Sequence, residues 1–269
     1  MRTVVIQSYR TTHVEPWIQR CMQTVQAWSG NSRYEYEFID DALFDHVPQH
    51  IRDCPISSLL PFTDIARLGV LRERLASTYE RAIWFDADIV IFRPDRLRIP
   101  DGCGAMLSHE IWTSIDNNGH LSHRRGINNA ALVFKRDHPL LDFLHHASIE
   151  LFEHRYPARL RSTTLGPDFL TPLGHIVPLR LLTQVACLSP LLMHALFSGE
   201  NPAVLHAHAE QYGYEFHAAN LCRSAWAPFR TLETNHSFAL HESQILEIVE
   251  TLIATRGTAL ILNSGGSNH

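Results

Sequence analysis

The first 150 residues alternate between strand-like runs and segments of helical periodicity, and this alternation is the strongest constraint on the fold. Runs typical of buried strands cover residues 4–6, 34–39, 82–85, 89–92, 105–108 and 130–135. Apolar side chains recur at helical spacing over residues 14–28, 61–75 and 139–154. Strands that alternate with helices form mostly parallel sheets covered by helices. We therefore expect an α/β fold with a central, mostly parallel mixed sheet and helices on both faces.

The pattern is looser after residue 155. The sequence predicts a turn into a short helix at residues 166–168, a strand at 203–206, an irregular segment at 217–229 and an amphipathic helix at 243–255. No internal repeat or linker divides the chain, so we expect one domain over residues 1–262. The polar residues 263–269 are expected to form a disordered tail.

Composition excludes several classes of function. The 269 residues carry a formal net charge of −5, which gives no basic surface for nucleic acid. The five cysteines form no C-x-x-C pair, which is typical of a reducing compartment. No apolar run reaches the ~18 residues of a membrane-spanning helix. The apolar run at the N-terminus is also too short for a signal peptide. We expect a cytoplasmic protein without a transmembrane segment, and the sequence leaves peripheral membrane contact open.

The motif Asp86-Ala87-Asp88 is the strongest candidate for a functional site. It directly follows the apolar run 82–85, so both carboxylates are expected at the carboxyl end of a buried strand. Ligands bind at that edge in open α/β sheets. Carboxylates cannot hold a diphosphate directly, but they can hold a divalent cation that bridges to its phosphate oxygens. The motif therefore predicts a nucleotide-diphosphate site with Mn²⁺ or Mg²⁺.

Two other functions fit the same residues. In a haloacid-dehalogenase-type phosphatase, Asp86 would be the nucleophile and Asp88 the general acid/base. Such enzymes also need a downstream lysine and a late paired acidic motif. The chain has a single lysine, Lys135, and no acidic pair follows Asp88. The other alternative is a catalytically inactive module that binds a nucleotide-sugar.

Four further segments carry a resemblance to a known family. They are Phe62–Leu71 with an s-D-x-x-R-x-x-x-L pattern, the Asn-led strand 128–134, the G-P segment 165–171, and the closing segment 217–226 that ends in Trp226. Together with the acidic motif, they are ordered along residues 62–226. In this the chain resembles the DXD-containing glycosyltransferases of the GT-A fold. The nearest group contains capsular-polysaccharide synthesis enzymes and eukaryotic α-mannosyl- and α-N-acetylglucosaminyltransferases.

The resemblance implies roles for individual residues. Asp64 and Arg67, at i and i+3 of a helix, would orient the donor sugar and its phosphates, although a plain helical ion pair fits them equally. Asn128 and Asn129 would contact the donor or only form a turn. Asp168 would contact the acceptor or cap a helix.

The resemblance also implies a set of metal ligands. Asp88 would be the main ligand, and Asp86 would bind the metal or the ribose. His217 would complete the protein's share of the shell, with His206 and His208 as the next candidates. Trp226 fits a core position or the wall of a subsite better than a catalytic role.

Two departures place the chain between families. Arg81-Ala82 stand where the group above has Gly-Gly, and the separation of Asp64 from Asp86 is long. Both features lean toward the glycogenin-like galactosyltransferases. Because both groups are retaining enzymes, the resemblance implies transfer of a hexosyl unit, with retention, from a nucleotide diphosphate sugar to a hydroxyl acceptor. UDP is the favoured nucleotide, and polysaccharide or glycoconjugate synthesis the favoured setting. Donor sugar and acceptor stay open.

Overall fold

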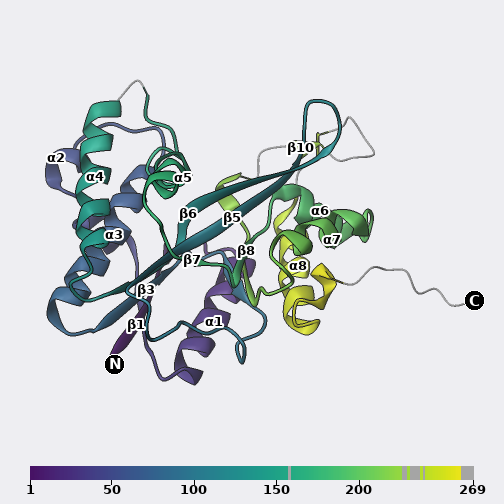
Figure 1. Cartoon of the computed structure of the whole chain (residues 1–269), viewed down its shortest axis with the longest axis horizontal. Helices are drawn as coiled ribbons and strands as arrows, with labels where there is room; N and C mark the ends of the chain where they lie inside the picture. Colours follow the sequence, from purple (N-terminus) through teal and green to yellow (C-terminus); the bar gives the residue numbers. More distant parts are fainter. Residues whose placement is uncertain (157–158, 226–228, 231–236, 239, 262–269) are drawn as a thin grey trace, which may run out of the picture.

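A six-stranded mixed sheet forms the centre of the molecule. The computed structural model describes residues 1–156, 159–225, 229–230, 237–238 and 240–261 (Figure 1). The strand order is β2-β1-β3-β6-β5-β7. Its strands are β1 (Thr3–Ser8), β2 (Glu35–Ile39), β3 (Arg81–Phe85), β5 (Ala105–Ile115), β6 (Leu121–Lys135) and β7 (Leu181–Leu182). Three of the five pairings, β1–β2, β1–β3 and β5–β7, are parallel. The predicted α/β class is confirmed.

Smaller sheets lie beside the central one. The order β4-β9-β8 joins β4 (Ile89–Ile91), β9 (Ala218–Asn220) and β8 (Val185–Cys187). A two-stranded ribbon pairs β10 (Phe229–Arg230) with β11 (Ser237–Phe238). Because β3 belongs to the central sheet and β4 to the second, residues 86–88 are the link between the two sheets.

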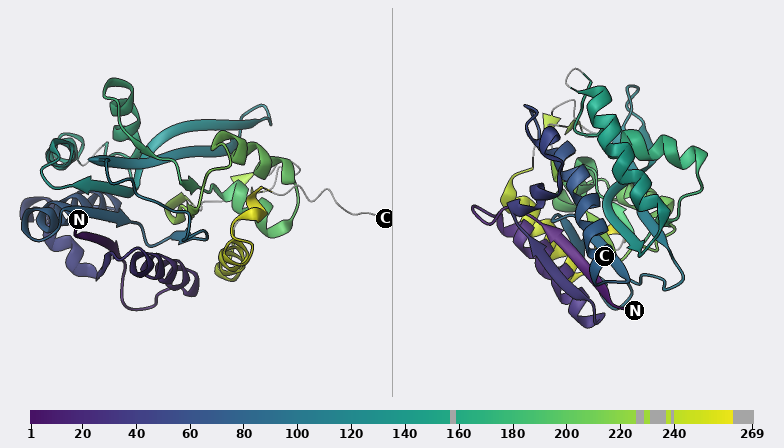
Figure 2. Two further views of the ribbon diagram at one scale, coloured as in Figure 1. Left: turned by 60° about the horizontal axis from the view of Figure 1, so that its bottom comes forward. Right: turned by 90° about the vertical axis from the view of Figure 1, so that its left-hand side faces the viewer.

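Helices cover both faces of the central sheet (Figure 2). The α-helices are α1 (Pro16–Asn31), α2 (Gln49–Arg52), α3 (Leu60–Ser77), α4 (Pro139–Arg155), α5 (Pro167–Ile176), α6 (Pro190–Ser198), α7 (Pro202–Gln211) and α8 (Glu242–Ala254). Short 3-10 turns are η1 (Asp41–His46), η2 (Arg223–Ala225) and η3 (Thr258–Leu260). Successive side chains of a strand point to opposite faces. Accordingly Val4 of β1 packs with Ile65 of α3, while Val5 packs with Val25 of α1.

A further hydrophobic cluster ties the carboxyl-terminal helices to the second sheet. Ile245 and Leu252 of α8 join Trp17 of α1 and Val90 of β4 in this cluster. The apolar spacing that predicts the helix therefore also fixes the face it buries. None of the described helices is long and apolar enough to cross a membrane.

The structure corrects three expectations. Residues 203–206 lie in helix α7, because Pro202 occupies its first turn, where a missing N–H costs nothing. The segment expected to be irregular contains β9. The short strands expected at 105–108 and 130–135 are parts of a long antiparallel hairpin, β5–β6. Trp226 and the predicted tail at 263–269 lie outside the described residues.

Arg81 explains one departure from the family pattern. It is 1% exposed, and its guanidinium donates to Thr3 Oγ1 at 3.2 Å, to the Ile99 carbonyl at 3.4 Å and to the Tyr34 hydroxyl at 3.0 Å. It also lies over the Tyr34 ring. Arg81 thus fixes the start of β3 by hydrogen bonds, at a position where the glycosyltransferase group that the chain resembles has glycine.

Replacing Arg81 should therefore destabilise the fold. We expect Arg81→Met to lower the free energy of unfolding by roughly 2–4 kcal/mol, since buried acceptors lose a charged donor. Urea denaturation followed by circular dichroism measures this. The control is Asp101→Asn, because the Asp101 side chain is 89% exposed despite its ion pair with Arg81; it should change stability by less than about 0.5 kcal/mol. Equal effects of the two variants would contradict the anchoring role of Arg81.

Candidate functional site

The acidic motif forms the turn between β3 and β4. The Asp86 N–H donates to the Ala130 carbonyl at 2.8 Å, which continues the β3–β6 ladder. The Asp86 carbonyl accepts from the Ile89 N–H at 3.1 Å and from Gln7 Nε2 at 3.1 Å. These bonds fix the backbone, so the side chains of Asp86 and Asp88 are left to line a cavity at the carboxyl end of β3.

Arg67 of α3 gathers several predicted residues into one cluster. Its guanidinium lies 3.0 Å from Asp86 Oδ1 and 3.3 Å from Asp64 Oδ1, and it donates to the Asn129 carbonyl at 2.7 Å. Asn129 Nδ2 donates to Asp64 Oδ1 at 2.9 Å, and Trp84 Nε1 donates to Asp86 Oδ1 at 2.7 Å. The pair of Asp64 and Arg67 is thus more than a helical ion pair, because it holds the first aspartate of the motif.

Asp88 is in a different electrostatic position from Asp86. Its Oδ2 accepts the Arg223 backbone N–H at 2.9 Å, but among the described residues no arginine, lysine or histidine forms an ion pair with it. Burial, together with the charge of Asp86, raises the pKa of Asp88 to about 6. Burial also raises the pKa of Asp64 to about 6, against the effect of Arg67. Asp88 is therefore the carboxylate that most needs a cation.

The β5–β6 hairpin forms the opposite wall of the cavity. Glu110 is 5% exposed and accepts from Asn128 Nδ2 at 3.0 Å and from Arg124 Nη2 at 3.2 Å. Trp112 lines the same cavity. Of these four residues only Asn128 follows from the sequence motifs. The residues after Ser108 do not alternate between apolar and polar, since Ile111 and Trp112 are adjacent, so no strand pattern singles out Glu110 and Trp112.

Gly166 brings a third motif to the cavity. A Cβ placed there would lie 3.3 Å from Asn129 Oδ1, so a side chain at residue 166 would crowd the Asn129 amide. Asp168, in the first turn of α5, instead binds Arg161 at 2.8 Å and Thr163 Oγ1 at 2.7 Å. It does not line the cavity of the acidic motif, and among the described residues α5 has no side-chain cap hydrogen bond, so the carboxylate binds Arg161 and Thr163 and does not cap the helix.

The expectation that His217 ligates the same ion as the aspartates is wrong. The His217 carbonyl accepts from the backbone N–H groups of Phe92 and Arg93, just beyond the far end of β4 from Asp88. About four residues of extended chain, or roughly 13 Å, separate the two positions. His206 and His208 lie on α7, not on a strand. His208 is buried against Thr113 Oγ1 at 2.8 Å, so the alternative histidine pair has no common face toward the motif.

The cavity, of about 250 Å³, has a negative balance of charge. Its ionisable lining comprises four carboxylates and two guanidiniums, from Asp64, Asp86, Asp88, Glu110, Arg67 and Arg124. With all of them ionised, the formal sum is −2. A diphosphate would be repelled by such a lining unless a divalent cation came with it.

The carboxylates of the cavity fit a divalent cation whose coordination shell is completed by substrate phosphates and water. Among the described residues, no group of three or more His, Cys, Asp or Glu side chains is placed to hold a metal ion. Mg²⁺ and similar ions are commonly held by one or two carboxylates together with substrate phosphates and water. Asp86 and Asp88 match that arrangement, whereas a closed protein cage would need further ligands.

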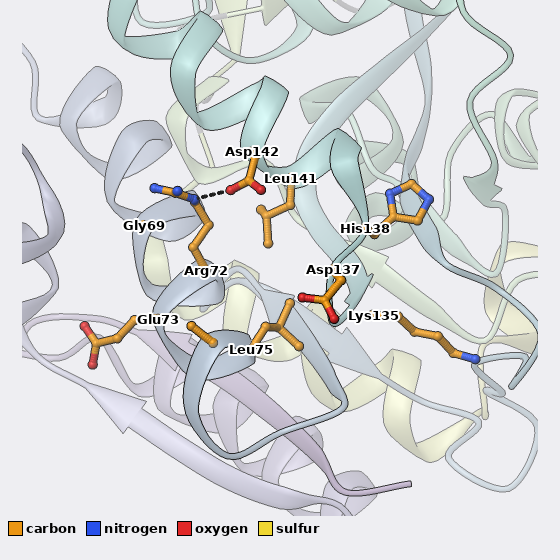
Figure 3. Close-up of a pocket in the computed structure, with 10 residues that line it drawn as sticks. Gly69, Arg72, Glu73, Leu75, Lys135, Asp137, His138, Leu141 and Asp142 are labelled. Carbon is orange, nitrogen blue, oxygen red and sulfur yellow. Dashed lines mark hydrogen bonds and ion pairs between the residues drawn. The ribbon is translucent and has the colours of Figure 1, made fainter.

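A larger cavity, of about 480 Å³, lies elsewhere and is shown in Figure 3. It lies near Lys135, which pairs with Arg81, the first residue of β3. This is the amino end of β3, opposite to the edge where α/β sheets bind ligands. Two of its charged side chains, Arg72 and Asp142, already pair with each other at 2.6 Å. The smaller cavity, which contains the acidic motif, is therefore the better candidate site.

Solved structures identify the class of fold. The chain is similar to a glycosyltransferase involved in the glycosylation of the major capsid of PBCV-1, with a TM-score of 0.50 and 9% sequence identity over 93% of this chain and 100% of that chain. It is also similar to the apo-form glycosyltransferase GlyE of Streptococcus pneumoniae TIGR4, with a TM-score of 0.47 and 11% identity over 96% of this chain and 62% of that one. For mouse xyloside xylosyltransferase 1 the TM-score is 0.40, with 12% identity over 84% of this chain and 99% of that one.

Sequence comparison gives no matching family model and no curated protein of significant similarity. The structural match at a TM-score of 0.50 shows that the chain has a glycosyltransferase fold, as the resemblance implies.

The electrostatics of Asp88 predict a pH-dependent stability. Folding raises the pKa of Asp88, so ionising this carboxylate is harder in the native state than in the unfolded state. The free energy of unfolding therefore falls as pH rises from about 4 to about 6, and it stays lower at higher pH. Asp88→Asn keeps an acceptor for the Arg223 N–H and removes the charge. We expect the variant to be about 1–3 kcal/mol more stable than the parent at pH 8, with no difference at pH 4.

Denaturation with urea at both pH values tests this. The control Asp168→Asn changes an exposed carboxylate outside the cavity and should alter stability by no more than about 0.5 kcal/mol. An Asp88→Asn protein that is less stable than the parent at pH 8 would refute the assignment of Asp88 as an uncompensated charge.

Proposed function

We propose that the chain is a metal-dependent, retaining glycosyltransferase that moves a hexosyl unit from a UDP-sugar to a hydroxyl acceptor in polysaccharide or glycoconjugate synthesis. One observation carries the proposal. In a glycosyltransferase fold, the β3–β4 turn places two carboxylates in a cavity of negative charge, and Arg67 pairs with only the first of them. A divalent cation and the diphosphate of a donor would complete that charge balance.

The metal site would be formed by Asp86 and Asp88. Asp88 supplies the unpaired carboxylate, and Asp86 is held in place by Arg67 and Trp84 through Oδ1. A bound Mn²⁺ or Mg²⁺ neutralises a diphosphate leaving group. The protein's own contribution is preorganisation, because the carboxylates are fixed before the donor arrives.

The donor would lie across the carboxyl ends of β1 and β3. Beyond the end of β1, the buried Glu15 accepts from Arg223 at 2.5 Å and from the Tyr9 hydroxyl at 2.8 Å, and it pairs with Arg10 at 2.8 Å. Two guanidiniums therefore converge on Glu15, and the backbone N–H of Arg223 donates to the Asp88 carboxylate. This is where the nucleotide and its phosphates would find positive charge. On the other side of Asp86, Asp64 and Asn129 would orient the sugar, with Asn128 behind them.

Retention is proposed from the resemblance, and the state of the carboxylates bears on its route. Asp64 and Asp86 are bound to Arg67, and Glu110 to Arg124 and Asn128, while Asp88 is the main metal ligand of the proposal. Each carboxylate of the described lining therefore already has a partner or a proposed role other than that of a nucleophile. Attack by the acceptor on the face that the leaving group departs from fits this site better than a covalent intermediate.

The phosphatase alternative fits the site poorly. A nucleophilic Asp86 would have to use Oδ2, because Oδ1 is bound by Arg67 and Trp84. The stronger objection is the lysine that such an enzyme needs. The single lysine, Lys135, lies opposite Arg81 at the other end of the β3–β6 ladder and cannot reach the motif. An inactive nucleotide-sugar-binding module has the same cavity and is separated from a transferase only by turnover.

The first test is the mutual dependence of metal and nucleotide. Isothermal titration should show Mn²⁺ binding at least about tenfold tighter in the presence of UDP than alone, because the phosphates complete the shell. Asp88→Asn should remove this effect and lower the release of UDP from UDP-sugars at least about 100-fold. His217→Asn is the control and should leave the Mn²⁺ titration unchanged, since His217 lies at the far end of β4. Normal UDP release by Asp88→Asn would exclude the metal site, and binding without any release would indicate the inactive module.

The second test is stereochemical. With an α-linked UDP-sugar as donor, the first product should carry an α linkage, because acceptor and leaving group share one face. Proton NMR of the anomeric signal of the transferred sugar decides the point. A β-linked first product would rule out retention.

A further inference from the structure

The hairpin β5–β6 presents one row of side chains to the cavity. In its register, Trp112 lies directly opposite Arg124, and Glu110 lies opposite Gly126. Residues two apart on a strand share a face, so Glu110, Trp112 and Arg124 lie on the same side of the hairpin. All three line the cavity that also contains Asp88. The wall facing the acidic motif is therefore built from an aromatic ring, a carboxylate and a guanidinium.

This row runs from the interior to the surface. Glu110 is 5% exposed, Trp112 is partly exposed, and the side chain of Arg124 is 62% exposed. Two residues of strand advance the chain by about 7 Å, close to the width of one pyranose ring. A ligand lying along the row would have one end beside Glu110, within the cavity, and the other end in solvent.

The inner end of the row is already oriented. Asn128 donates to Glu110 Oε2, and Arg124 donates to Oε1 through Nη2. These two bonds fix the carboxylate plane but use only one lone pair of each oxygen. The other guanidinium donors of Arg124 have no partner among the described residues. The Glu110 carboxylate can thus accept, and the Arg124 guanidinium can donate, further hydrogen bonds to a ligand in the cavity.

We propose that Glu110, Trp112 and Arg124 form the subsite for a saccharide acceptor, an inference that rests on the proposed transferase activity. A sugar ring combines an apolar C–H face, which packs on an aromatic ring, with vicinal hydroxyls, which suit a carboxylate and a guanidinium. The combination of an aromatic ring, a carboxylate and a guanidinium on one face of the hairpin therefore suits a sugar ring. The acceptor hydroxyl nearest Glu110 is the one that enters the cavity of Asp86 and Asp88.

The position of the row assigns it to the acceptor instead of the donor. Nucleotides in α/β folds lie across the carboxyl ends of parallel strands, which here are β1 and β3. The converging guanidiniums of Arg10 and Arg223 are on that side. The row lies on β5 and β6, which follow β3 in the order of the sheet and pair antiparallel with each other. Donor and acceptor would therefore meet between the two walls.

Direct binding of simple saccharides tests the subsite without requiring turnover. The probes are the methyl α- and β-glycosides of xylose, glucose, galactose and mannose, observed by saturation-transfer NMR with UDP and Mn²⁺ present. At least one glycoside should bind the parent protein, and Trp112→Ala and Glu110→Gln should each weaken its binding about tenfold. Trp112→Phe keeps an aromatic face and should lose less. Phe143→Ala is the control, because Phe143 is an exposed aromatic residue on α4, away from this cavity.

Each outcome bears on the proposal. Loss of glycoside binding in Trp112→Ala and Glu110→Gln, with the UDP dissociation constant changed less than twofold, supports the subsite. No binding of any glycoside to the parent, or equal binding to Trp112→Ala, overturns it. Weakened UDP binding in Trp112→Ala with glycoside binding intact would also overturn it, because the ring would then serve the nucleotide. Failure of the transferase proposal is seen separately, as absence of UDP release while glycosides still bind.

Discussion

The site depends on one buried guanidinium. Arg67 touches Asp64, Asp86 and the Asn129 carbonyl and lies over the ring of Trp84, so it ties α3, the end of β3 and β6 to one point. Removing one partner of such a buried cluster leaves an uncompensated charge and costs about 3–5 kcal/mol. A lysine has neither the planar fork nor the same affinity for an aromatic face. The same contact that stabilises the fold therefore fixes the first carboxylate of the acidic motif.

Sequence patterns predict those elements whose signal is local. The helix of Asp64 and Arg67 and the strand that ends at Phe85 follow from apolar spacing and from a buried run. That Asn129 meets Asp64 does not follow from either. Their contact depends on the antiparallel pairing of β3 with β6, which sets Phe85 opposite Ala131. Pairings between distant segments leave no periodicity in either segment, so the motif order could suggest the cluster but not its bonds.

Two features that the sequence did not predict, the hairpin wall and the position of His217, also depend on the pairing of strands. The loop between β5 and β6 is closed by Asp116, which accepts from the N–H groups of Asn118 and His120, and by Gly119 at a φ of 83°. Asn118-Gly119 indicates a turn, but the flanking residues do not alternate between apolar and polar, so no local pattern predicts the strands of the wall that carries Glu110. The position of His217 also has no local signal in the sequence. It is set by the register of β4 with β9, which places His217 beside Phe92 and not beside Asp88.

The bond from the Trp84 indole to Asp86 has a spectroscopic consequence. Indole emission depends on nearby charge, and Trp84 contacts both the guanidinium of Arg67 and the motif carboxylate. Of the five tryptophans in the chain, Trp112 lines the same cavity, whereas Trp17 and Trp28 are buried residues of α1. Intrinsic fluorescence therefore responds to both walls of the cavity without a label, and the difference between the parent and a Trp112→Phe variant gives the contribution of the hairpin wall.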